Sequence, residues 1–178
     1  MSQHHIEALA TLANMHYIAT QVHSRTPVVD ETGNSVVDYM NKATEHLNNS
    51  MFHSTTGNPQ SSLFSLKQSY EHTHGVLGML IAAGEDQYKQ ATQGKIPAST
   101  VMANMTDMNS FTEHHSAFLS KSKDIIANEQ EKGLAQRDSR RESLNNAREA
   151  IDSVADEHNL LLPGNWVNRG DGRSPNGE

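Results

Sequence analysis

The chain has 178 residues, of which 35% are hydrophobic and only 5% aromatic, and its formal net charge is −7. An apolar share of roughly 45–50% is usual on a slightly wider count that includes glycine, so this composition favours a thin helical bundle over a thick globule. The negative charge argues against a coat for nucleic acid, which needs a positive field. The absence of cysteine excludes disulfides, thiolate zinc sites and thiol catalysis.

No targeting or membrane segment is expected. The N-terminal residues lack a basic region followed by an apolar run, so they do not resemble a secretory signal peptide. The longest uncharged apolar stretch, residues 76–84, is far shorter than the roughly 20 residues that span a bilayer. We therefore expect a soluble protein, located in a virion or in the cytoplasm.

The first part of the chain predicts two amphipathic helices. Apolar residues recur every three or four positions from residue 2 to about 23, and Pro27 should end that helix. A second helix is expected from a cap at Asn34 or Ser35 to about residue 47, since a side-chain oxygen can accept from the free amides of the first turn. Residues 51–62 are rich in Ser, Thr, Asn, Gly and Pro, which predicts a loop.

A long helical hairpin follows and should organise the fold. Its arms are expected over residues 61–93 and 99–126, because large apolar residues keep helical spacing on both sides of a break at 94–99. A short connection makes the arms antiparallel neighbours. Gly75 and Gly78 each cost about 1 kcal/mol in a helix interior, so we expect another backbone to approach them closely.

Methionines are concentrated on this hairpin. Met102, Met105 and Met108 lie on the second arm, and Met79 lies on the first. Core packing is the favoured interpretation, because methionine fills irregular gaps between helices. The alternative is an adaptable surface that binds a partner.

The last third of the chain changes character. Residues 128–143 are mostly polar but rich in good helix formers, which favours a continuous or weakly kinked helix over a break near Gly133. An approximate heptad then returns with Leu144, Ala147, Ile151 and Val154. Residues 163–178, which include Trp166, are rich in Gly, Pro, Asn and Ser and should form an extended arm.

Basic residues in this region share one helical face. Arg137, Arg141 and Arg148 fall on that face and are interleaved with acidic residues. Such mixing is typical of a solvated helix with pairs four residues apart. We expect the arginines to meet an acidic groove on a partner helix and not the phosphates of a nucleic acid.

The eleven histidines suggest two alternatives. Glu71 and His74 have the E-x-x-H spacing of ferritin-like di-iron bundles, and Glu113 and His115 could face them from the other arm. Such a site needs two E-x-x-H pairs and two further glutamates, whereas only one such pair is found. The histidines could instead act as a pH switch.

The sequence thus predicts an all-α protein, an elongated antiparallel hairpin or bundle of four to five helices. Residues 1–162 would form the bundle with a long projecting final helix, and residues 163–178 the C-terminal arm.

We expect no catalysis and no cofactor. The predicted role is a structural or assembly subunit of a larger particle, with a bacteriophage virion as the leading setting, and its partners would be copies of itself or other particle proteins. The alternatives are a histidine-rich metal-binding bundle and a regulatory module that grips one partner.

Overall fold

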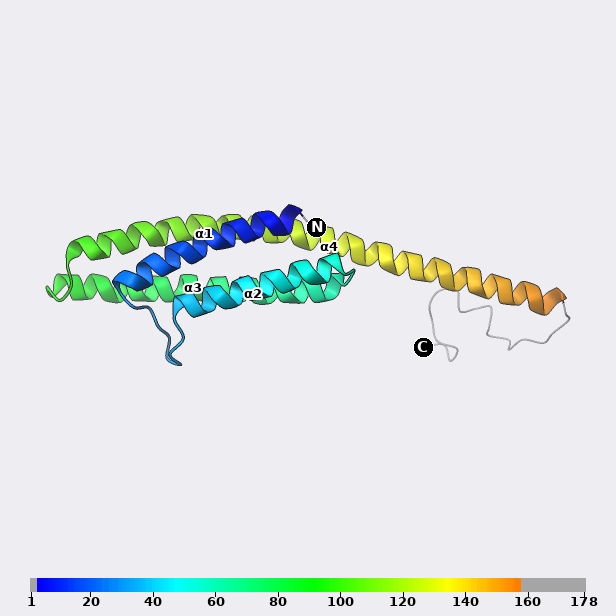
Figure 1. The fold of residues 1–178 in the computed structure, drawn as a ribbon, viewed down its shortest axis with the longest axis horizontal. Helices are drawn as coiled ribbons and strands as arrows, with labels where there is room; N and C mark the ends of the chain where they lie inside the picture. The colour runs from blue at the N-terminus through cyan, green and yellow to red at the C-terminus, as the bar shows by residue number, and fades with distance from the viewer. Residues whose placement is uncertain (1–2, 158–178) are drawn as a thin grey trace. The chain divides into compact units, whose positions relative to one another are not determined.

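The computed structural model describes the backbone of residues 3–157 and the side chains up to residue 154. Four helices account for most of these residues: α1 (Gln3–Arg25), α2 (Val36–Thr55), α3 (Pro59–Thr92) and α4 (Ala98–Glu157) (Figure 1). Contacts divide the chain into two units, Met1–Gln130 and Glu131–Glu178. The predicted arm over residues 163–178, with Trp166, lies outside the described residues.

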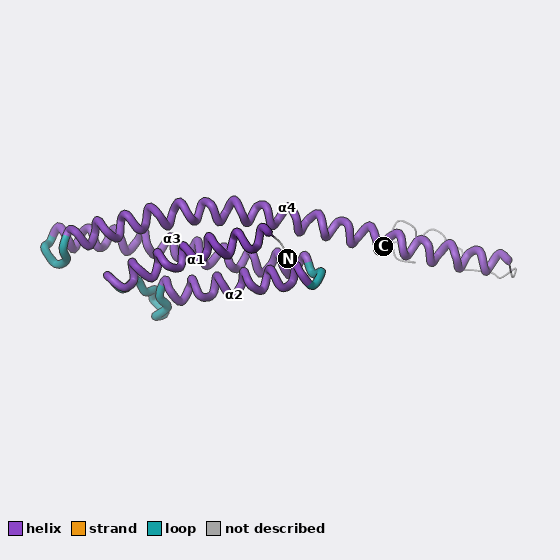
Figure 2. Tube along the Cα trace, turned by 45° about the horizontal axis from the view of Figure 1, so that its top comes forward, coloured by secondary structure: helices purple, strands orange, loops and turns teal. Residues whose placement is uncertain are grey.

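The first unit is an up-and-down four-helix bundle. His5 on α1 meets Ser50 on α2, Ser69 on α3 bonds to Ala43 on α2, and Gln87 on α3 bonds to Asn104 on α4. Together with the ring contact between Tyr70 and Phe118, these pairs make each helix antiparallel to the next. Figure 2 shows the four helices side by side in this unit. The all-α prediction and the antiparallel α3–α4 hairpin are therefore confirmed.

The helix boundaries follow from local chemistry. Ser35 and Asp38 form a reciprocal capping box at the start of α2, so the predicted cap is confirmed. Pro59 occupies the first turn of α3, where its missing N–H costs nothing. Gly94 follows α3 with a φ of +72°, a left-handed conformation that favours glycine.

One boundary prediction is wrong. Residues 51–55 belong to α2, although their composition predicted a loop. The hydroxyls of Ser54 and Thr55 are satisfied within the folded chain: Ser54 donates to Glu129, and Thr55 donates to the carbonyl of Met51 one turn back. Polar residues that bond in this way are tolerated in a helix, so the loop contracts to the residues around Gly57.

The core of the bundle joins all four helices. Phe111, Phe118 and Ile125 of α4 are fully buried against residues such as Leu12, Met40 and Leu80. Small polar residues complete the buried face of α3, including Ser62, Ser69 and Thr73. These short side chains let α2 and α3 approach closely, and their hydroxyls find partners on the neighbouring helix or on their own.

Gly75 and Gly78 do not mark a close approach within the described chain. Both are exposed, and a Cβ placed on either would meet no described atom within 4 Å. Because Gly75 follows the buried Thr73 by two positions, it faces away from the core. The close helix contact is instead formed by the serines of α3.

The helix α4 runs without a break through Gly133, as predicted. In the second unit it carries residues 131–157, whose large apolar side chains are exposed: Leu134, Leu144, Ile151 and Val154. None of the helices in the described part of the chain is long and apolar enough to cross a membrane.

Candidate interaction surfaces

The four residues of the alternative metal site do not come together. His74 and His115 are neighbours, with ring centroids 5.9 Å apart, but Glu71 and Glu113 are exposed. Glu71 pairs with Lys67 at 3.7 Å on the surface of α3. Among the described side chains of residues 3–154, no group of three or more His, Asp or Glu residues is placed to hold a metal ion. The four residues are separated because Glu71 and Glu113 occupy solvent-facing positions of their helices.

His74 and His115 belong to an aromatic cluster. The His115 ring packs on Tyr70 at 5.2 Å and on Phe111 at 6.4 Å, and Tyr70 also stacks on Phe118. His115 is buried, and its Nε2 has no hydrogen-bond partner in the described chain. Burial, with a smaller contribution from His74, lowers the pKa of His115. The cluster therefore packs best with a neutral His115.

A second histidine pair joins α2 and α3. The rings of His46 and His72 lie 5.1 Å apart, and Tyr39 approaches His72 at 5.9 Å. Burial and the neighbouring His72 lower the pKa of His46. Both pairs thus place two imidazoles close together, where charging both would be unfavourable.

These pKa shifts predict that the bundle loses stability in mild acid. A histidine whose pKa is lower in the folded state than in the unfolded state contributes stability above its unfolded pKa, near 6.5, and loses it as the pH falls further. The melting temperature of the wild-type chain should therefore fall between pH 7.5 and pH 5. The His115→Gln variant should show a smaller fall, as measured by circular dichroism.

The matched control for this measurement is His16→Gln on α1, a partly buried histidine outside both pairs. This variant should keep the pH dependence of the wild type. An equal fall in melting temperature for the wild type and for His115→Gln would show that protonation of His115 does not destabilise the fold.

The methionines divide between core and surface. Met79 and Met108 pack against the core, as predicted, but Met102 and Met105 are 69% and 47% exposed. Their exposure contradicts the core interpretation for these two residues. Met105 and Met108 line a groove between α3 and α4 with a volume of about 440 Å³, together with Ile81, Gly84, Glu85, Tyr88 and Lys89.

This groove is apolar, but its rim does not indicate a particular ligand. Glu85 and Lys89 lie one turn apart on α3 and carry opposite charges. Gly84 leaves space for the Met108 sulfur, which lies 3.8 Å from the position of a Cβ at residue 84. The sequence signal for the groove was the concentration of methionine on one arm, although periodicity alone could not tell its core positions from its surface positions.

The second surface is the helix of residues 131–157. Leu144 and Ile151 are 53% and 44% exposed, and Leu134 and Val154 are exposed to a similar degree. Arg137 and Arg141 are exposed beside them, whereas Arg148 is buried and donates to Asn145 Oδ1 at 3.2 Å. The three arginines proposed to face one partner therefore differ in their environments.

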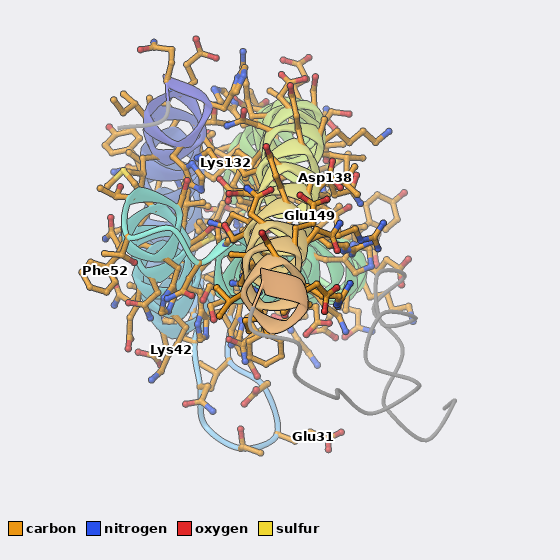
Figure 3. The ribbon with its side chains drawn as sticks, turned by 90° about the vertical axis from the view of Figure 1, so that its right-hand side faces the viewer. Glu31, Lys42, Phe52, Lys132, Asp138 and Glu149 are labelled. Atoms are coloured by element: carbon orange, nitrogen blue, oxygen red, sulfur yellow. The ribbon has the colours of Figure 1, made fainter. Side chains whose placement is uncertain are left out.

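Other exposed aromatic residues lie singly on the bundle. Phe52 projects away from α2 in Figure 3 and is 63% exposed. Phe64 is exposed on α3. Isolated exposed side chains of this kind are normal on a protein surface.

The geometry therefore offers two apolar surfaces, the α3–α4 groove and the exposed face of residues 131–157, and the described side chains form no group of three or more that could hold a metal ion. Comparisons with models of protein families, with curated proteins and with solved structures gave no match to this chain.

Proposed function

We propose that this protein is a non-enzymatic structural or assembly subunit of a multi-subunit particle, and that the particle is a bacteriophage virion. One observation carries the proposal. The bundle buries a core of its own, whereas residues 131–157 expose four large apolar side chains along a single helix. Most helical stability in proteins comes from packing of an apolar face, so a helix of this kind is suited to a contact with another chain.

The composition supports the same role. The chain is acidic and poor in aromatic residues, and the part of the 60-residue helix α4 from residue 131 on is mainly polar. Long helices with apolar stripes commonly associate with other helices through those stripes. The virion setting rests on this general character and on the lack of a recognised catalytic motif in the sequence.

Incorporation into particles tests the proposal. Particles purified from the source culture on a density gradient should contain the protein at a fixed ratio to the other particle proteins, as measured by quantitative mass spectrometry. The double variant Leu144→Ser and Ile151→Ser should reduce that ratio about tenfold or more, since burying each side chain in a contact contributes roughly 1.5–3 kcal/mol.

The matched control is Ile6→Ser with Ile126→Ser, two side chains of the bundle that are 42% and 38% exposed. This double variant should be incorporated like the wild type. Absence of the wild-type protein from purified particles would contradict the proposed function. Equal incorporation of both double variants would remove residues 131–157 from the explanation.

A further inference from the structure

We infer that residues 131–157 of α4 dock on the same residues of a second copy of this chain, and that the two helices run antiparallel. This inference deepens the proposed function and rests on it, because it names the partner of the exposed face. It is carried by the order of apolar and charged side chains along the helix.

Residues at heptad spacing form one line along this helix, which we call the seam. Leu144, Ala147, Ile151 and Val154 follow one another at spacings of three and four, and all are exposed. Continuing the same heptad backwards by seven residues from Leu144 and Ala147 reaches Arg137 and Arg140, which are also exposed. The seam is therefore basic in its first half and apolar in its second half.

The charged residues of this helix are also distributed unevenly along it, with the basic ones concentrated in the first half and the acidic ones in the second. The stretch 132–141 carries four basic residues and one acidic residue, namely Lys132, Arg137, Arg140 and Arg141 against Asp138. The stretch 149–157 carries no basic residue and four acidic ones, namely Glu149, Asp152, Asp156 and Glu157. Figure 3 labels Lys132, Asp138 and Glu149 on this helix. Counted over the whole of residues 131–157, the first half, 131–144, also contains Glu131 and Glu142 and has a net charge of +1, whereas the second half, 145–157, also contains Arg148 and has a net charge of −3. The first half is therefore weakly basic and the second half acidic.

This asymmetry decides the direction of pairing. In a parallel pair, Arg137 and Arg140 of each copy would lie on the same arginines of the other copy, and the acidic halves would also meet. Like charges directly opposite are unfavourable. In an antiparallel pair the weakly basic half of each copy lies along the acidic half of the other, so the net charges of the facing halves are opposite.

The antiparallel register also gives each residue of the seam a suitable residue opposite it in the second copy. When Leu144 lies opposite the second copy's Ala147, Arg140 falls opposite Ile151 and Arg137 opposite Val154, and two-fold symmetry repeats each pair. The aliphatic part of an arginine covers apolar surface while its guanidinium reaches outwards. Here the guanidinium groups would reach the carboxylates of the second copy's acidic half, such as Asp152.

The length of the helix suits such a contact. In this register residues 134–157 of the two copies overlap, and 24 residues at a rise of about 1.5 Å per residue give a contact roughly 36 Å long. Arg148 takes no part in the charge pairing, since it is buried and bonded to Asn145. A second copy of the chain therefore fits this face, because it places apolar side chains opposite the seam and opposite net charges along the two halves.

Self-association of the purified full-length chain tests the inference. Analytical ultracentrifugation should show a monomer–dimer equilibrium that weakens as the salt concentration rises, because the exposed charges are screened. The variant Arg137→Glu with Arg140→Glu should raise the dimer Kd about tenfold or more. Adding Glu149→Lys and Asp152→Lys to that variant should restore dimerisation, because the complementary halves are exchanged and not removed.

The matched control is Lys42→Glu with Lys67→Glu, which makes the same change in net charge at two exposed positions of the bundle. This control should leave the dimer Kd unchanged. Circular dichroism of each variant reports whether its helices are intact. A Kd that rises equally in the control and in the arginine variant would overturn the inference.

Direction is measured with spin labels, which are simple to place because the chain has no cysteine. Labels on Ala135→Cys and Ser153→Cys should give a shorter distance between residue 135 of one copy and residue 153 of the other than between equivalent residues of the two copies. The reverse order would show a parallel pair and overturn the inference. A chain that stays monomeric but is still incorporated into particles would overturn the inference while leaving the proposed function standing.

Discussion

The substitution Phe118→Ala is expected to lower the free energy of unfolding by about 3–5 kcal/mol, the usual cost of removing a phenylalanine from a close-packed core. Phe118 is fully buried, and its ring stacks on Tyr70 across the α3–α4 contact. Phe118 belongs to a core cluster drawn from all four helices, and such surroundings relax only partially into the space that a removed ring leaves. Urea unfolding followed by circular dichroism measures the change.

Phe64→Ala is the matched control, because Phe64 is 62% exposed on α3 and the substitution removes the same atoms. Its effect should stay within about 0.5 kcal/mol, as is usual for surface positions. Similar losses for the two variants would mean that the α3–α4 contact does not form the core described above.

The second large effect is expected at Asn104, which lies buried in a polar network at the end of the bundle. Its amide donates to Gln87 Oε1 at 2.9 Å and to Thr26 Oγ1 at 3.3 Å, and its carbonyl oxygen accepts from Arg25 at 3.2 Å. Asn104→Ala should therefore lower the free energy of unfolding by about 1–3 kcal/mol, because Gln87 loses its partner while it remains buried.

Asn49→Ala provides the comparison, since Asn49 is an exposed residue inside α2. That substitution should be neutral or slightly stabilising, because alanine favours the helix more than asparagine does. Urea unfolding of both variants measures the difference. An unchanged stability for Asn104→Ala would show that the network contributes nothing to the fold.

Apolar periodicity and caps predicted where the helices lie, although not the C-terminal end of α2. The spacing on α1, the cap at Ser35 and the break at Gly94 all correspond to features of the structure. Continuity of α4 through Gly133 followed from the helix propensity of its neighbours. These are local properties, so a single sequence contains the information that they require.

The side of each helix that meets its neighbours was harder to predict. Ser62, Ser69 and Thr73 are buried on α3, and the first two form hydrogen bonds with α2, but a search for large apolar residues ignores all three. Counting small residues as core candidates would have found them at helical spacing. Met105 shows the reverse error, since apolar character alone does not place a residue inside.

The predicted interaction residues were likewise selected from local features of the sequence, namely helix propensity and position on a helical face. Gly75 and Gly78 were selected because glycine is costly in a helix, yet nothing in the described chain approaches them. Arg137 and Arg141 were selected by their shared face and are exposed on it. Whether a partner covers that face depends on a second molecule, which the periodicity of one chain does not specify.

The order of the helices in the bundle has a consequence for how it folds. Three of its antiparallel contacts join helices that are consecutive in the chain, so these contacts close only short loops and can form early. The contact between α1 and α4 joins distant segments, and the ion pairs Glu7–Lys121 and Arg25–Asp107 lie near its two ends. We expect this contact to form last, with the two charged pairs selecting the register in which the chain closes on itself.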